Sequence, residues 1–401
     1  MEEVQERTVV RPCPRVLLVC SSCTGHLIPF AELSRCLVAD HSLAATLLFA
    51  AATSPPPAQY LSLAASALDS RDTHADRDHP DLSWRAFWPD RDRVGSSLPD
   101  SAVWGGVFAL AVTDMIGTPA LVVMVELGVP SYVFFTSPWM ALSLFLRLPE
   151  LDILCFGEHH DATESIFLLG YTSIHAHELL SESYVGMLSM AEEFRGVDNI
   201  LVNTFRDLEP AVGDSLEGLE VLVHPVGPLV LTRSVSMDWD HESLRPDQDT
   251  SSGSFFGATQ GEETSMDFLP KGFIERTKGI GLMIQAWVPQ SSILAHTSVG
   301  CFITHSGWNS SLEKQHMNAS MLEVQVWVAT VGPNRFTSKE EVATAIHHGM
   351  EGEESKKMMK RASELKEKSE HALSKVGCST QALAQITDTW KQVAGANGGN
   401  R

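Results

Sequence analysis

The residues with the most informative chemistry lie between positions 287 and 315, a stretch with two tryptophans, two histidines, an asparagine, several serines and a glutamate. A short apolar run at residues 300–304 predicts a buried strand, and a His-Ser-Gly turn and a helix start follow it. Free backbone N–H groups and the positive end of the helix dipole attract anions at such a start. Trp287 offers a flat face to a base, and Glu313 can accept hydrogen bonds from sugar hydroxyls. Together these features favour a nucleotide-sugar diphosphate as the ligand.

A second candidate for chemistry, His26, follows an apolar run at residues 15–20 that predicts the first strand. Ligands of α/β folds bind at the carboxyl ends of strands, and an imidazole titrates near working pH. From the residues alone, a loop histidine that caps a helix is the simpler interpretation. Asp114 ends another predicted strand, at residues 107–112, and its simpler role is to cap a helix that starts at Ile116.

These residues must be positioned by an α/β framework, because apolar strand-like runs alternate with helical patterns along most of the chain. We expect further strands at residues 43–50, 131–135, 199–203 and 282–285. We expect helices starting at Leu27 with Pro29 in the first turn, at 57–68, at 116–127, from a Ser137 cap through Leu148, at 182–194, after a Ser338 capping box, at 355–376 and at 381–393. Residues 69–99 predict an irregular surface segment with at most one short strand, and residues 394–401 a frayed tail.

Composition narrows the classes of function. The net charge of −21 argues against nucleic acid and anionic membranes as partners, and no apolar segment is long enough for a signal peptide or a membrane span. Seven scattered cysteines argue against a disulfide framework and favour a reducing, cytoplasmic location. A length of 401 residues suits two domains, and we expect a monomer.

Several motifs carry a family resemblance: WVPQ from residue 287, ILAH from 293, HSGWNSSLE from 305, GHLIP from 25 and LGVPSYVFFTS from 127. In this order and spacing they resemble the plant UDP-dependent small-molecule glycosyltransferases, near the hydroquinone glucosyltransferase-like members of plant secondary metabolism. The resemblance implies an α/β GT-B fold, in which two Rossmann-like domains face each other across a cleft. It also implies transfer of glucose from UDP-glucose, as a co-substrate, to a small hydroxylated acceptor, with no metal and no other cofactor.

The resemblance assigns roles residue by residue. His26 would be the catalytic base and Asp114 the carboxylate that orients it, in a single inverting displacement. Trp287 and Gln290 would bind uracil, and Glu313 and Gln315 would bind ribose and sugar hydroxyls. The diphosphate side of the donor site would be formed by residues of the turn and the helix start: His305, Gly307, Trp308, Asn309 and Ser310.

The predicted domains are an acceptor-binding domain at residues 1–230, a disordered Ser/Asp/Glu/Gly-rich linker at 231–267 and a UDP-sugar-binding domain at 268–401. The second domain departs from the family pattern. The strand that should open it is missing, with residues 253–257 the nearest piece, and Lys314 stands at the acidic sugar-binding position. We therefore expect a truncated second domain, and we keep a second hypothesis, a non-catalytic relative that binds UDP weakly or not at all.

Overall fold

The computed structural model describes residues 13–21, 24–50, 82–87, 108–156, 165–166, 174–175, 184–197, 199–216, 221–230, 254–257, 271–278, 281–284, 294, 302–303 and 338–398. The chain forms two compact units. The first unit joins Met1–Val230 to His305–Arg401, and the second comprises Leu231–Thr304.

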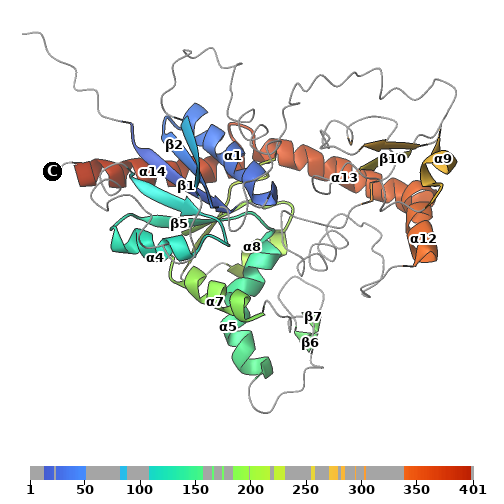
Figure 1. Ribbon diagram of the computed structural model, residues 1–401, viewed down its shortest axis with the longest axis horizontal. Helices are drawn as coiled ribbons and strands as arrows, with labels where there is room; N and C mark the ends of the chain where they lie inside the picture. Colours follow the sequence, from blue (N-terminus) through green and yellow to red (C-terminus); the bar gives the residue numbers. More distant parts are fainter. Residues whose placement is uncertain are drawn as a thin grey trace, which may run out of the picture. The chain divides into compact units, whose positions relative to one another are not determined.

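A seven-stranded parallel sheet forms the centre of the first unit (Figure 1). Its strand order is β3-β2-β1-β4-β5-β8-β9. The strands are β1 (Arg15–Ser21), β2 (Ala44–Ala50), β3 (Leu82–Phe87), β4 (Leu110–Thr113), β5 (Ser131–Phe135), β8 (Asn199–Val202) and β9 (Leu222–Pro225). The chain builds outward from β1 to β3 and then returns to the other side of β1 with β4. The strand order therefore reverses between β1 and β4, although all the strands are parallel. This pair is the topological switch point of the sheet.

Helices cover both faces of this sheet, so the unit has three layers. The helices of the first unit are α1 (Thr24–Ala39), α4 (Pro119–Glu126), α5 (Trp139–Phe156), α7 (Tyr184–Arg195), α8 (Pro210–Leu216), α12 (Lys339–Met350), α13 (Gly352–Ala372) and α14 (Cys378–Gly398). On one face, α1 and α14 pack on alternate residues of β1, β4 and β5, among them Leu18 and Phe134. On the other face, α4 packs on β1 and β4, and α5 and α7 pack on β5 and β8. The continuous apolar strands are explained by this burial on both sides.

The strands predicted from the sequence are confirmed for β1, β2, β5 and β8. The predicted capping box is also confirmed, because the Ser338 hydroxyl accepts from the Glu341 N–H at the start of α12. The predicted short strand within residues 69–99 is β3, while the helix predicted at 57–68 lies outside the described residues. The helix predicted at residues 182–194 is α7, and β4 begins three residues later than predicted.

Several predicted helix ends are wrong. α1 begins at Thr24, so Pro29 lies beyond the first turn, because the small residues before Leu27 carry no apolar periodicity. α5 begins at Trp139 and continues through Pro149 to Phe156, well past the predicted end at 148. α13 ends at residue 372, and α14 continues to residue 398 through part of the tail that we expected to fray.

α13 and α14 come from the C-terminal part of the chain, belong to the first unit and pack on its other elements. Trp390 of α14 is 1% exposed and makes an edge contact with Tyr132 of β5, with ring centroids 5.2 Å apart. α13 buries Leu365 and Ala372 in a cluster with Phe205 and Leu208. This packing anchors both helices, since most of the stability of helices in proteins comes from tertiary contacts.

The second unit contains β10 (Ser254–Gly257), α9 (Phe273–Thr277) and β11 (Gly281–Ile284) among its described residues. β10 pairs in parallel with β11, which confirms the strand predicted at 282–285. β10 lies within residues 231–267, which we expected to form a largely disordered linker, and the rest of that range lies outside the described residues. The Phe-Phe pair of β10 is flanked by Gly and Ser, so the low apolar content of the surrounding window hid a strand that a partner stabilises.

The buried strand predicted at residues 300–304 is not formed at its two described positions. Phe302 and Ile303 have no regular structure and are 53% and 64% exposed. A strand needs a neighbouring strand to pair its backbone N–H and C=O groups. An apolar run alone does not indicate whether such a neighbour is present. Within the described part of the chain, no helix combines the length and apolar character that crossing a membrane requires.

Candidate active site

The carboxyl ends of β1 and β4 bring His26 and Asp114 together, although 88 positions separate them in the sequence. His26 is the third residue of α1, which begins shortly after β1 ends, and Asp114 directly follows β4. The two strands are paired, and the Asp114 N–H donates to the Val19 carbonyl of β1 at 3.1 Å. The pair therefore lies at the topological switch point, where open α/β sheets bind ligands.

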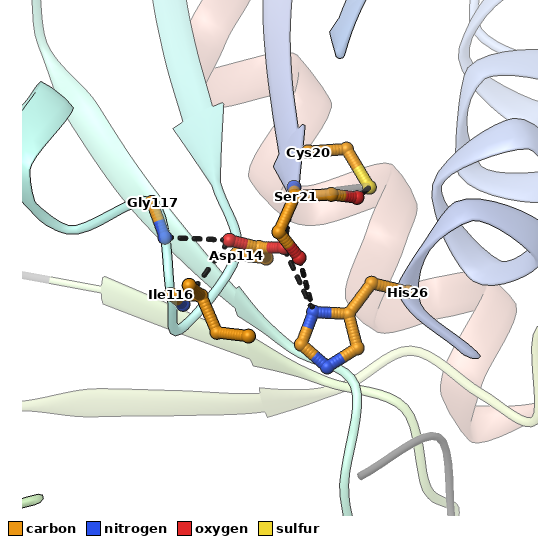
Figure 2. A network of polar contacts seen from close by, with 6 residues as sticks. All are labelled: Cys20, Ser21, His26, Asp114, Ile116 and Gly117. Atoms are coloured by element: carbon orange, nitrogen blue, oxygen red, sulfur yellow. Dashed lines mark hydrogen bonds and ion pairs between the residues drawn. The ribbon is translucent and has the colours of Figure 1, made fainter. Parts of the chain in front are cut away.

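A short hydrogen bond joins the two side chains (Figure 2). His26 Nδ1 lies 2.8 Å from Asp114 Oδ2, and the residues are 2% and 0% exposed. An ionised carboxylate can only accept, so Nδ1 must carry the proton that joins them. Nε2 is then the unprotonated nitrogen, and Figure 2 shows it on the side of the ring that points away from Asp114. An imidazole held in this tautomer can accept a proton at Nε2.

Backbone N–H groups hold the carboxylate of Asp114 from both sides. Its Oδ2 accepts from the Ser21 N–H at 2.7 Å, and its Oδ1 accepts from the N–H groups of Ile116 at 3.1 Å and Gly117 at 2.6 Å. Burial by itself would raise the pKa of the Asp114 carboxyl, but the hydrogen bond and charge of His26 and the hydrogen bonds from Ser21 outweigh burial and lower this pKa. Asp114 is therefore a fixed anion beside the imidazole.

The two roles considered for Asp114 are divided between its two oxygens. Oδ2 faces His26, while Oδ1 accepts from the turn at residues 116–117. The helix predicted to start at Ile116 instead begins at Pro119, so Asp114 stabilises a turn before α4 and not the helix itself. Gly117 is required in this turn, because a Cβ there would lie 2.3 Å from Thr113 Oγ1 and 3.0 Å from Asp114 Oδ1.

A buried carboxylate that the sequence did not reveal caps the helix after β5. Glu209 is 0% exposed and accepts from the N–H groups of Trp139 at 3.0 Å and Met140 at 2.9 Å, and from the Thr204 hydroxyl at 2.7 Å. It accepts from the first two N–H groups of α5, while the cap predicted at Ser137 stays a prediction. Because Glu209 lies about 70 residues away from the helix it caps, no local capping pattern could have identified it.

The predicted donor-binding residues remain predictions. They lie outside the described residues, so the structure does not test their placement: Trp287, Gln290, His305, Gly307, Trp308, Asn309, Ser310, Glu313 and Gln315.

Comparison with known proteins identifies the class to which this arrangement belongs. The sequence model of the family "UDP-glucoronosyl and UDP-glucosyl transferase" matches residues 272–370. A hydroquinone glucosyltransferase from Rauvolfia serpentina is 30% identical over 465 residues, which cover 94% of this chain and 98% of the relative. UDP-glycosyltransferase 72B1 of Arabidopsis thaliana is 31% identical over 468 residues, covering 94% and 96% of the two chains.

Solved structures agree with the sequence relatives. UGT2 of Phytolacca americana, in complex with UDP-2-fluoro-glucose and pterostilbene, has a TM-score of 0.75 at 26% identity and covers 95% of this chain and 100% of its own. A UDP-glucosyltransferase from Polygonum tinctorium has a TM-score of 0.74 at 25% identity, covering 95% and 99%. The protein thus has the α/β GT-B fold of the plant UDP-glycosyltransferases.

The chain belongs to the UDP-glucosyltransferase family and is a UDP-glycosyltransferase of the hydroquinone glucosyltransferase-like type. The family resemblance of the sequence motifs is confirmed. The alignment with the Rauvolfia relative spans 465 residues, more than the 401 of this chain, so the relative has segments that this chain lacks.

Proposed function

We propose that the protein transfers glucose from UDP-glucose to a hydroxyl of a small phenolic acceptor, with His26 as the general base. The observation that carries the proposal is the buried 2.8 Å hydrogen bond between His26 Nδ1 and Asp114 Oδ2 at the switch point of the sheet. The choice of substrates is supported by the relatives, which are named for hydroquinone as acceptor or bind a UDP-sugar together with pterostilbene.

The reaction follows from the tautomer that Asp114 imposes. Nε2 of His26 takes the proton of the acceptor hydroxyl as the oxygen attacks the anomeric carbon of glucose. The new C–O bond forms as the bond from this carbon to the diphosphate breaks, and UDP leaves with the electron pair. Attack from the side opposite the leaving group inverts the anomeric configuration. Asp114 stabilises the imidazolium that forms and remains ionised throughout.

The donor half of the proposal depends on the motif at residues 287–315. The helix start near Asn309 would place free N–H groups against the departing diphosphate, which disperses its charge without a metal ion. Trp287 would stack on uracil, and Glu313 would bind the ribose hydroxyls. We propose further that the enzyme is cytoplasmic, because its odd number of scattered cysteines suits a reducing compartment. We also propose that it acts as a monomer.

The test is turnover with a matched inactive control. UDP-glucose and a panel of phenols that includes hydroquinone are incubated with the wild type and with a His26→Ala variant, and UDP release is measured. We expect the wild type to release UDP and to form a β-glucoside from the α-linked donor, identified by the coupling constant of the anomeric proton. No release above the His26→Ala level, with UDP binding detected by calorimetry, would instead support the non-catalytic alternative.

A further inference from the structure

Ser21, the last residue of β1, contacts both members of the His26–Asp114 pair in different ways (Figure 2). Its backbone N–H donates to Asp114 Oδ2 at 2.7 Å, and its hydroxyl oxygen lies 3.1 Å from His26 Nδ1. It is 7% exposed, so these contacts are shielded from bulk water.

The protonation states decide which group donates at the hydroxyl. Nδ1 carries a proton because it faces the ionised oxygen of Asp114. The Ser21 oxygen must therefore accept from Nδ1–H, which places this single proton between two acceptors. The hydroxyl hydrogen remains available to Asp114, and the Ser21 side chain does contribute to lowering the pKa of that carboxyl. The Ser21 hydroxyl thus accepts from the imidazole, while the Ser21 backbone N–H donates to the carboxylate.

We propose that Ser21 is a positioning residue that holds the imidazole of His26 in its base-competent orientation and stabilises its protonated form. The proposal rests on the proposed role of His26 as the base. A hydrogen bond to Nδ1–H is stronger when the ring is cationic, so Ser21 assists the step in which Nε2 gains the acceptor's proton. The backbone N–H of Ser21 anchors Asp114 independently of the side chain, so removal of the hydroxyl leaves that anchor in place.

The substitution Ser21→Ala separates the two contributions of this residue. We expect kcat to fall roughly tenfold, a part of the roughly 10²–10⁴-fold that a positioned base supplies, with the KM for UDP-glucose unchanged. We also expect the acid limb of the pH–rate profile to move to lower pH, because the protonated ring loses an acceptor. Ser21→Thr, which keeps the hydroxyl, should restore both the rate and the profile.

Ser34→Ala is the matched control. Ser34 is buried like Ser21 and lies in α1, but its hydroxyl donates to the Phe30 carbonyl at 2.7 Å, within its own helix. It should lower the melting temperature by an amount similar to Ser21→Ala without changing the pH profile. A merely structural Ser21 would give the same result as this control.

A ring titration tests the proposal independently of turnover. The protein is labelled with ¹⁵N-histidine, and the His26 resonances are assigned by their loss in His26→Gln and followed against pH. We expect the titration midpoint of this ring to lie lower in Ser21→Ala than in the wild type, and to be unchanged in Ser34→Ala. An unchanged midpoint in Ser21→Ala would overturn the role of Ser21, whether or not UDP-glucose is a substrate. Absence of turnover with a shifted midpoint would instead count against the proposed function and leave the positioning role supported.

Discussion

Replacing Asp114 by asparagine changes the hydrogen-bonding character of the site while nearly preserving its shape. The carboxylate accepts four hydrogen bonds, two at Oδ1 from a backbone turn and two at Oδ2 from Ser21 N–H and His26 Nδ1–H. An asparagine amide has one oxygen and one NH2 group. Because the oxygen that accepts from the turn satisfies two N–H groups, we expect the NH2 to face Ser21 and His26.

This orientation reverses the tautomer of the imidazole. The asparagine NH2 donates to Nδ1, so the ring proton moves to Nε2, and the nitrogen that should accept the substrate proton is already occupied. We expect kcat to fall roughly 10³–10⁴-fold, the size associated with loss of a correctly oriented base, while the KM for UDP-glucose changes little. The Ser21 N–H also loses its acceptor, so we expect the free energy of unfolding to fall by about 1–3 kcal/mol.

The assay pairs UDP release under saturating substrates with urea unfolding of the same preparations. Asp207→Asn is the matched control, because Asp207 is a half-exposed carboxylate in the same unit, paired with Lys368 at 3.3 Å. It should change both measurements little, since exposed ion pairs contribute roughly 0–1 kcal/mol. If Asp114→Asn keeps kcat within threefold of the wild type, Asp114 does not set the tautomer and the mechanism is wrong.

Four further outcomes follow from the same structure. Glu209→Gln should lower the free energy of unfolding by about 1–3 kcal/mol in urea titrations, since one buried donor at the start of α5 loses a charged acceptor. Gly117→Ala should reduce kcat without abolishing folding, measured by turnover and circular dichroism, because the new Cβ pushes against the side chains of Thr113 and Asp114. Trp390→Ala should lower stability by about 3–5 kcal/mol and the melting temperature with it, because the indole is fully buried between α14 and the sheet. Because the pKa of Asp114 is lowered in the folded state, its ionised carboxylate contributes stability that is fully present above the ordinary carboxyl pKa of about 4. This stability is lost as pH falls through the lower pKa of the folded state. Urea titrations at several acidic pH values should show this loss in the wild type and not in Asp114→Asn.

The sequence predicted the first unit well because its strands are buried on both faces and therefore read as continuous apolar runs. β5 was predicted with its observed bounds for this reason. β10 was not predicted, because its stability comes from pairing with β11, more than twenty residues along the chain, and its own composition is small and polar at both ends. Glu209 was missed for the same kind of reason, since its partners belong to a helix that precedes it by about 70 positions.

The sequence suggested two roles for Asp114, capping a helix at Ile116 and orienting a histidine. The geometry shows that Asp114 holds a turn instead of the helix, and that holding this turn and orienting His26 depend on each other. A carboxylate held by His26 alone could rotate about its Cβ–Cγ bond and exchange oxygens. The N–H groups of Ile116 and Gly117 fix Oδ1, so Oδ2 stays directed at Nδ1. The turn therefore supplies the preorganisation that a catalytic carboxylate needs, and it does so with backbone groups that no side-chain motif records.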